Sequence, residues 1–382
     1  MKKNIFKSNG FQSLLASLLC IVLGLFLGYL VLLVINPAGA GEAILTVVKN
    51  FLTYKKTSSQ LKYLGNTLVK TAPLLMCSLS ILFAYKVGLF NIGAAGQYCF
   101  GVALSLYAAL GLGWSWLPCL LVAMAGGAVL GAISGVLKSY CNVNEVISGI
   151  MLNWIVLYLT NMLLTTVKEA ASPYTIVLAN NNPSAVLPSL GLGALFNKNQ
   201  YVGLAIPLSI VMAILIWIVL DKTRFGYELK ATGFNRNAAK YCGMAEKRNV
   251  ILSLVISGAL AGMGAALLYL TGYEQWQCST SSVPAMGFNG ISVALLASSN
   301  PIGTIFSALF ISHISVGGTF LSTKYYPTEI ADLISGIIIY LCAFSMLFRG
   351  KIQKLLFKNA DKTNVNAEPA PAEKANAKKE GK

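Results

Sequence analysis

The side chains that carry out most enzyme chemistry are scarce in this sequence and poorly spaced for it. The one histidine, His313, lies in an apolar stretch, so a Ser/His/Asp set cannot form. The eight cysteines include no Cys-x-x-Cys pair, which argues against a metal site. The string Gly65–Thr71 lacks the second glycine of a P-loop. We therefore expect no catalytic residue, no metal ligand and no nucleotide-binding motif.

Amide side chains next to glycine-rich sequence are the strongest candidates for contact with a solute. They occur in Gly88–Gln97, beside Trp154, and after Gly287. Amides donate and accept hydrogen bonds without a charge, which suits a neutral, hydroxyl-rich molecule such as a nucleoside or a sugar. An asparagine inside an apolar helix is also a common bond between helices, and both interpretations stay open. The candidate residues of a solute path are Phe90, Asn91, Gln97, Asn153, Phe288 and Asn289.

The composition places these residues in a membrane protein. Hydrophobic residues make up 56% of the 382 residues, charged residues only 11%, and the mean hydropathy is +0.67. A soluble chain has about 25% charged residues, so this chain needs lipid around it. The net charge of +16 comes mainly from Lys2, Lys3 and Lys7, residues 221–249 and residues 349–382. Basic residues concentrated in a few loops indicate membrane orientation and argue against a nucleic-acid partner.

Ten apolar stretches reach or approach the roughly 20 residues that a spanning helix needs. The first follows a basic start, as a cleaved signal peptide would, but its apolar run exceeds the ~7–15 residues of such a signal. We expect an all-α polytopic membrane protein whose eighth helix is short or broken. The spans are Leu14–Ile35, Leu68–Tyr85, Gly93–Leu112, Trp116–Leu137, Val146–Thr166, Tyr201–Leu220, Val250–Thr271, Met286–Ser299, Ile302–Leu321 and Glu329–Phe348.

The positive-inside rule sets the expected orientation, with the N- and C-termini in the cytoplasm. The outer segment 36–67 is an exception to this rule, because it holds Lys49, Lys55, Lys56 and Lys62. The expected divisions are residues 1–35 (basic N-terminus and first helix), 36–67 (extracytoplasmic loop), 68–220 (helices two to six), 221–249 (long cytoplasmic loop), 250–348 (helices seven to ten) and 349–382 (basic, disordered tail).

An internal echo indicates two related halves. The Phe-Asn pair of Gly88–Gln97 recurs in Gly287–Leu296, and each pair opens the third helix of a five-helix half. Because five is odd, the halves have opposite topology. This pattern predicts two inverted halves with solute bound at their interface.

Glycines four residues apart predict close packing between helices. The series Gly127, Gly131 and Gly135 and the pair Gly258 and Gly262 each place small residues along one helix face. These glycines indicate a tight bundle and carry no information about the solute.

The loop 221–249 is long for a compact membrane protein, and such loops usually have a function. Its aromatic and aliphatic content argues against disorder, and its glycines bracket two helix-forming stretches. We expect short helices presented to a cytoplasmic partner. The candidate contact residues are Phe225, Gly226, Gly233, Asn235, Ala238, Ala239 and Gly243.

Together these segments resemble the permease subunits of bacterial ABC importers, in the branch that handles ribose-type sugars and nucleosides. The resemblance runs from about Leu64 to Phe348. A string within Asn144–Trp154 is closer to the nucleoside-type permeases. Ala95 departs from the family, which usually has Glu there. The strongest matches are Gly88–Gln97, Asn144–Trp154, Lys230–Gly243 and Gly287–Leu296 with Asn300-Pro301.

The resemblance implies an importer in the bacterial cytoplasmic membrane. It would contain two related permease chains, two cytoplasmic ABC ATPase domains that bind ATP and Mg, and an extracytoplasmic solute-binding protein. The permease itself would carry no cofactor, and its loop 221–249 would be the segment that couples to the ATPase. A nucleoside is the expected solute, and ribose or another simple sugar is the alternative.

An ion-coupled secondary transporter is the rival class. It could also have ten helices in inverted halves. It would usually need an ionisable residue within the membrane, whereas the candidate path here is uncharged. It would have no use for a long basic loop that faces a cytoplasmic partner.

Overall fold

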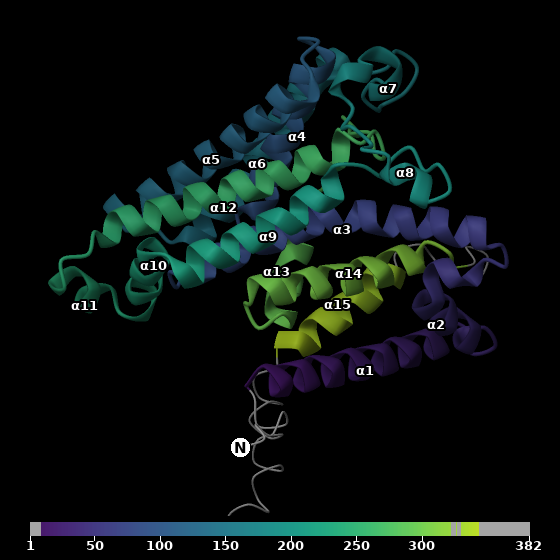
Figure 1. Ribbon diagram of the computed structural model, residues 1–382, viewed down its shortest axis with the longest axis horizontal. Coiled ribbons are helices and arrows are strands. Elements are labelled where there is room, and N and C mark those ends of the chain that lie inside the picture. The colour runs from purple at the N-terminus through teal and green to yellow at the C-terminus, as the bar shows by residue number, and fades with distance from the viewer. Residues whose placement is uncertain (1–8, 322–325, 327–329, 344–382) are drawn as a thin grey trace, which may run out of the picture.

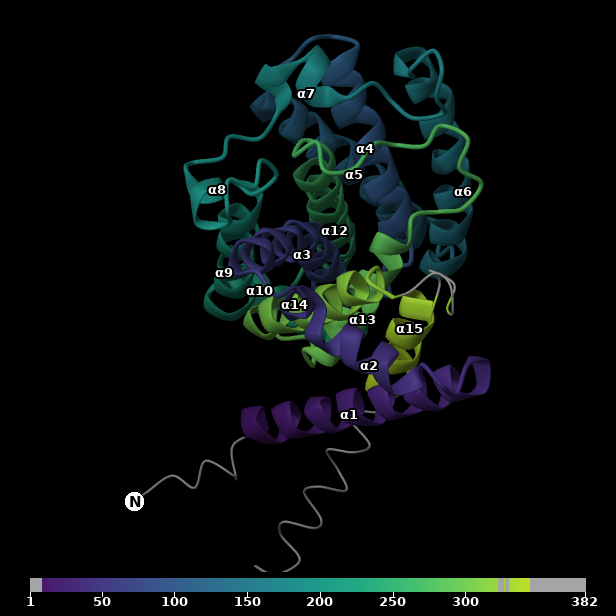
Figure 2. The same ribbon diagram turned by 90° about the vertical axis from the view of Figure 1, so that its right-hand side faces the viewer.

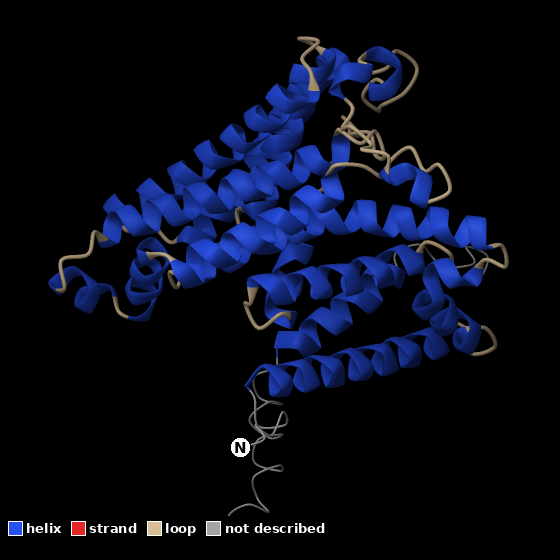
Figure 3. Ribbon diagram, in the orientation of Figure 1, coloured by secondary structure: helices blue, strands red, loops and turns tan. Residues whose placement is uncertain are grey.

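The computed structural model describes residues 9–321, 326 and 330–343, and this part of the chain is helical without strands (Figure 3). Its extended pairing is limited to two isolated bridges, Lys168 with Thr175 and Tyr174 with Gln277. The basic N-terminal lysines and the tail 349–382 lie outside the described residues. The predicted all-α class is confirmed for the described part.

Every predicted span overlaps a helix. Among the described residues, α3, α5, α6, α9, α12 and α14 are long and apolar enough to cross a membrane, so the protein is polytopic. Crossing by all ten helices stays a prediction. α13 has only 12 residues, which confirms a short eighth helix. The helices that overlap the spans are α1 (Asn9–Ile35), α3 (Thr57–Tyr85), α4 (Ala94–Leu110), α5 (Trp116–Tyr140), α6 (Glu145–Leu164), α9 (Ala205–Lys222), α12 (Glu246–Tyr269), α13 (Ala285–Leu296), α14 (Pro301–Gly318) and α15 (Ile330–Ala343).

Shorter helices fill the connections. The segment 36–67 differs from the expected loop, since it contains α2, a 3-10 turn at Asn50–Thr53 and the first turns of α3. The other short helices lie between α6 and α9 and between α9 and α12. Their bounds are α2 (Ala40–Lys49), α7 (Leu178–Asn181), α8 (Leu192–Leu195), α10 (Arg224–Phe234) and α11 (Arg236–Tyr241).

The long helices share one general direction, which gives the molecule two ends (Figure 1). α10 and α11 lie at one end, and α2, α7 and α8 lie at the other. α3 and α12 are the most buried of the candidate spans, whereas α6 and α9 are largely exposed. α3 therefore runs through the middle of the bundle, between α12 and the α13–α14 pair (Figure 2).

The glycine series on α5 meets the glycine pair on α12, which confirms the predicted close packing between helices. A Cβ atom added to Gly127 would lie 2.1 Å from the carbonyl oxygen of Gly258, and one added to Gly131 would lie 2.1 Å from that of Leu254. Both distances are more than 1 Å shorter than ordinary carbon–oxygen contact. Only glycine allows the two backbones to approach this closely.

Candidate functional site

Two short helices, α10 and α11, form most of the loop between α9 and α12. Each begins with a side-chain cap. Thr223 Oγ1 accepts a hydrogen bond from the Gly226 N–H at 3.1 Å, and Asn235 Oδ1 accepts one from the Ala238 N–H at 3.0 Å. Such caps satisfy amides that a helix leaves unpaired at its start. Phe225 is half-buried beside the first cap. The predicted pair of short helices is confirmed.

Two of the predicted glycines press α10 against its neighbours. A Cβ atom on Gly226 would lie 2.3 Å from the Val219 carbonyl oxygen of α9. One on Gly233 would lie 2.4 Å from the Lys86 carbonyl oxygen, in the turn that follows α3. Gly243 has a φ of +78°, a backbone conformation that glycine adopts without steric cost because it has no Cβ atom. The backbone of α10 is therefore in direct contact with the backbone of α9 and with that of the turn after α3.

Ion pairs fasten the same helix. Lys230 Nζ lies 2.5 Å from Asp221 Oδ1, and Arg248 Nη2 lies 3.4 Å from Glu228 Oε2. Burial lowers the pKa of Lys86, the Lys230 ammonium lowers it further, and the Asp221 carboxylate opposes the shift. These charged groups tie α10 to α9 and to the start of α12.

Each of the two helices ends in a highly exposed aromatic residue. Phe234 is 95% exposed and Tyr241 is 92% exposed. Asn235 and Ala238 are also exposed, whereas Ala239 is buried against the chain itself. The sequence interpretation singled out the alanine pair and missed both aromatic residues. Large rings left in water on a rigidly held segment indicate a surface that a partner covers.

A buried polar network lies where α4 begins. Asn91 Nδ2 donates to Gln97 Oε1 at 2.8 Å and to Ser257 Oγ at 2.6 Å. Ser257 Oγ lies 2.9 Å from Ser80 Oγ. All four side chains are buried. The network joins the turn after α3, α4, α12 and α3 at a single point.

Asn153 of α6 binds the same region from the other side. Its Oδ1 accepts from the Gly96 N–H at 2.7 Å, and its Nδ2 donates to the Ile92 carbonyl at 3.1 Å. One turn earlier, a Cβ on Gly149 would lie 2.8 Å from the Gly93 nitrogen. The amides on both sides thus hold the start of α4 in place, and a role in a solute path stays a prediction.

The starts of α4 and α13 meet. A Cβ on Gly287 would lie 2.4 Å from the Ala95 Cα, and Ala95 is fully buried. This close approach gives a physical reason for a small residue at position 95, because a longer side chain would displace α13. Phe288 is partly exposed, and Phe90 and Asn289 are half-buried. The two Phe-Asn segments of the sequence echo therefore open helices whose first turns are in contact.

The exposed face of α6 carries two aromatic rings and differs in this from the exposed face of α9. Trp154 and Tyr158 are both exposed, and their rings stack with centroids 6.5 Å apart. They lie near the middle of the helix, whereas Trp and Tyr facing lipid prefer the membrane interfaces. The sequence interpretation noted Trp154 and missed Tyr158. The large exposed residues of α9 are aliphatic: Ile210, Val211, Ile214, Leu215 and Ile218.

At the opposite end from α10, the segment after α12 folds over the bundle. Trp276 is buried with its ring 6.1 Å from that of Tyr269, and its Nε1 donates to Asn161 Oδ1 at 2.9 Å. Lys70 of α3 forms an ion pair with Glu274 at 3.2 Å. These contacts fix the segment across that end of the helices.

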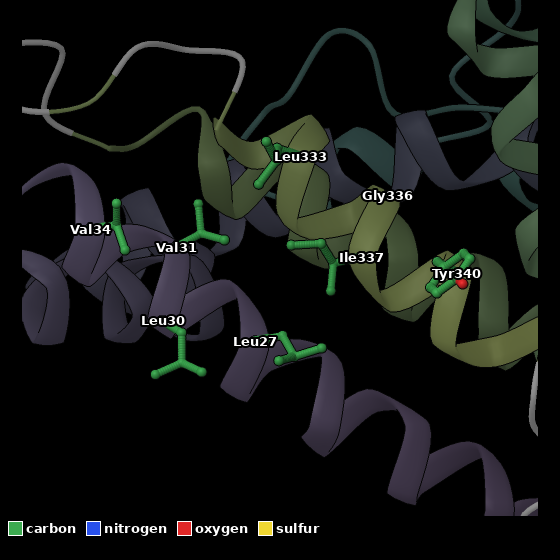
Figure 4. A pocket seen from close by; sticks show the side chains of 8 residues that line it. All are labelled: Leu27, Leu30, Val31, Val34, Leu333, Gly336, Ile337 and Tyr340. Atoms are coloured by element: carbon green, nitrogen blue, oxygen red, sulfur yellow. The ribbon is translucent and has the colours of Figure 1, made fainter.

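An apolar groove of about 670 Å³ lies between α1 and α15 (Figure 4). Its lining is apolar apart from the Tyr340 hydroxyl, so it does not suit a hydroxyl-rich solute. No group of acidic, histidine or cysteine side chains that could hold a metal ion occurs in the described part of the chain. The groove is lined by Leu27, Leu30, Val31, Val34, Leu333, Gly336, Ile337 and Tyr340.

Comparison with known proteins gives relatives that extend over nearly the whole chain. The guanosine ABC transporter permease protein NupP of Bacillus subtilis is 31% identical over 354 residues, which cover 91% of this chain and 98% of NupP. The nucleoside ABC transporter permease protein NupB of Lactococcus lactis is 31% identical over 379 residues, which cover 95% of this chain and all of NupB. The guanosine ABC transporter permease protein NupQ of B. subtilis is 28% identical over 64% of this chain and 77% of NupQ.

No solved structure gives a significant match. A family profile described as "Branched-chain amino acid transport system / permease component" matches residues 63–343. That region begins within α3 and ends with α15, so it contains the buried amide network, the meeting of α4 with α13, and the two short helices at one end. The chain therefore belongs to this family of transport-system permease components.

Proposed function

We propose that this permease imports nucleosides into the cytoplasm as one subunit of an ATP-driven ABC transporter. The observation that carries the proposal is the likeness to two permeases named for guanosine and nucleosides, which extends over 91% and 95% of the chain. The uncharged amides of the candidate site support it, because a nucleoside is neutral. Ribose or another simple sugar is the alternative solute, and an ion-coupled carrier is the less favoured class.

The proposed solute path passes Phe288 and Asn289 at the start of α13 and Trp154 and Tyr158 on the exposed side of α6. Exposed rings offer flat surfaces on which a nucleobase can stack, worth about 1–3 kcal/mol per base in other proteins. The half-buried Asn289 can add hydrogen bonds. Phe90, Asn91, Gln97 and Asn153 belong to the same proposed path, where the three amides also hold the start of α4 in place.

The energy for transport comes, in this proposal, from ATP hydrolysed by a separate cytoplasmic ATPase. Phe234 and Tyr241 are the proposed anchors for that partner, and the fixed seat of α10 supports the assignment. A second, related permease chain and an extracytoplasmic solute-binding protein complete the assembly, in the bacterial cytoplasmic membrane with this end of the molecule inside.

Uptake measurements test the transport proposal. The permease alone, reconstituted into vesicles with an ion gradient, should take up no labelled guanosine. The complex purified with its ATPase should take up guanosine on addition of ATP, and unlabelled purine nucleosides should compete better than ribose. Strong gradient-driven uptake by the permease alone would establish an ion-coupled carrier instead.

Substitution of the exposed rings tests the coupling surface. Phe234→Ala and Tyr241→Ala should weaken ATPase binding and leave membrane insertion unchanged, because neither ring packs within the chain. Tyr174→Ala removes an exposed ring at the opposite end and serves as the control. Gly233→Trp should unseat α10 and uncouple ATP turnover from transport. Normal ATPase binding and transport in all of these variants would show that the partner docks elsewhere.

A further inference from the structure

The segment Ala40–Thr53 has two opposite faces. In the α-helical part, α2, positions 40, 43 and 47 project to one side and positions 45 and 48 project to the other. Ala40, Ala43 and Val47 are buried, and so is Asn50 in the 3-10 turn that follows. Leu45 and Val48 point away from the protein, and Leu52 of the 3-10 turn is exposed as well. This short segment therefore has one face that packs on the bundle and one that is available to its surroundings.

The inner face is fixed by specific contacts. Asn50 Nδ2 donates to the His313 carbonyl at 2.9 Å and to Thr67 Oγ1 at 3.2 Å. The His313 ring nitrogen Nε2 lies 2.8 Å from the carbonyl oxygen of Val48. A Cβ on Gly317 would lie 2.2 Å from the Val47 carbonyl oxygen. The segment is thus held against α3 and α14 with a defined orientation.

The outer face is apolar. Leu45 is 54% exposed, Val48 is 43% exposed and Leu52 is 56% exposed. Water is an unfavourable environment for such side chains. Just before this segment, at the end of α1, Val34 is exposed as well. An apolar surface thus continues from a predicted membrane helix onto a segment that follows its end.

Four exposed lysines lie near this apolar face in the sequence. Lys49, Lys55, Lys56 and Lys62 are all exposed. None of them forms an ion pair with a described residue. Glu42 is the one acidic residue of α2. These are the lysines that break the positive-inside rule in the expected topology, so the transport function gives them no role.

We propose that residues Ala40–Lys62 form an interfacial anchor that binds anionic phospholipid in the outer leaflet. Leu45, Val48 and Leu52 enter the upper acyl region, and the lysines bind the headgroup phosphates around them. Apolar side chains on one face with cationic side chains beside them are the pattern of helices that lie in a membrane interface. Lysine stems reach from the apolar layer to the headgroups.

The same charges could attract an acidic protein, but the apolar residues favour lipid. The segment follows the end of α1, a predicted membrane helix, so its exposed aliphatic side chains lie where bilayer is expected. The lipid anchor also accounts for the lysines on the extracytoplasmic side, because the headgroup phosphates of the outer leaflet neutralise their charges.

Lipid binding by the purified permease tests the proposal. Thermal unfolding is followed in detergent during titration with phosphatidylglycerol or phosphatidylcholine. The wild type should be stabilised by phosphatidylglycerol at lower concentration than by phosphatidylcholine, and 0.5 M salt should reduce the difference. Each lysine near an anionic surface contributes about fivefold in affinity, so K55Q/K56Q should weaken phosphatidylglycerol binding about 25-fold. The matched control K55R/K56R keeps the charges and should bind as the wild type does.

A second measurement tests the apolar contact separately. Leu52→Trp places a fluorophore on the outer face, and phosphatidylglycerol with brominated acyl chains should quench it beyond the quenching seen in the parent protein. Equal phosphatidylglycerol binding by K55Q/K56Q and the wild type would overturn the proposal. So would the absence of added quenching in Leu52→Trp. If K55Q/K56Q keeps its lipid preference and loses binding of the purified solute-binding protein, the surface is a protein docking site.

Discussion

The substitution Asn153→Ala separates a structural role of this amide from a role in solute binding. The amide makes two hydrogen bonds, to the Gly96 N–H and to the Ile92 carbonyl. Both backbone groups lie where α6 covers the start of α4, so the truncation leaves them without a partner. A buried group left unsatisfied costs about 1–3 kcal/mol, whereas side-chain bonds between membrane helices average about 0.6 kcal/mol. We expect a loss of about 2 kcal/mol in the free energy of unfolding.

The assay combines thermal unfolding with uptake per folded molecule. Asn153→Ala should lower the unfolding midpoint by several degrees and leave the ranking of nucleosides unchanged, because the amide is buried and both of its polar atoms are bonded to the backbone. Asn289→Ala is the matched control. Asn289 is half-buried and makes no hydrogen bond with the described residues, so its removal should leave the midpoint unchanged and shift the ranking between purine nucleosides and ribose.

Asn153→Asp sharpens the comparison. A carboxylate keeps the acceptor for the Gly96 N–H but places a second acceptor against the Ile92 carbonyl, so it should destabilise the fold at least as much as alanine. The reasoning is refuted if Asn153→Ala unfolds at the wild-type temperature while it changes the solute ranking. Asn153 would then contact the solute directly, and the bonds to α4 would contribute nothing to stability.

Two further changes test the packing. Gly127→Val forces a side chain into the Gly258 carbonyl, so it should cost more than the ~1–3 kcal/mol of ordinary overpacking and abolish folding; Gly41→Val, where nothing lies within 4 Å, should express and unfold as the wild type does. Asn161→Ala removes two bonds, to the Trp276 ring and to the Thr280 carbonyl, and should cost about 1–3 kcal/mol. Hydrogen exchange in the segment after α12 should then accelerate, and unchanged exchange would show that these bonds do not hold the segment.

The sequence predicted the helices well because apolar length is a strong signal in a chain surrounded by lipid. The glycine spacing correctly predicted close packing between helices, although it did not show that α5 and α12 are the pair that meets. The same reasoning missed α2, because the helix is short and turns at Asn50, which adopts a φ of 46°. Its apolar outer face also resembles an ordinary buried face until the packing is known.

The candidate site was predicted only in part, because a sequence does not show which of its amide side chains are hydrogen-bonded within the protein. A sequence places Asn91 and Asn153 next to glycines but cannot state whether a backbone group takes up each amide. Both are buried, and both polar atoms of each amide are hydrogen-bonded within the protein. The sequence also does not show which large apolar residues are exposed. Phe234 and Tyr158 are of residue types common in protein cores, yet both lie on the surface.

A line of close contacts connects the short helices at the inner end with the middle of the bundle. Gly233 of α10 presses on the Lys86 backbone, which begins the turn that leads to Asn91. Asn91 is bonded to Gln97 of α4 and to Ser257 of α12. Because these backbones are in contact and these side chains are hydrogen-bonded, a displacement of α10 is passed on to its neighbours, as in other closely packed interiors. In the proposed transporter, movement of the ATPase against α10 would therefore shift the start of α4, where α13 touches it. The two helix ends that carry the Phe-Asn pairs are thus the elements that such movement reaches first.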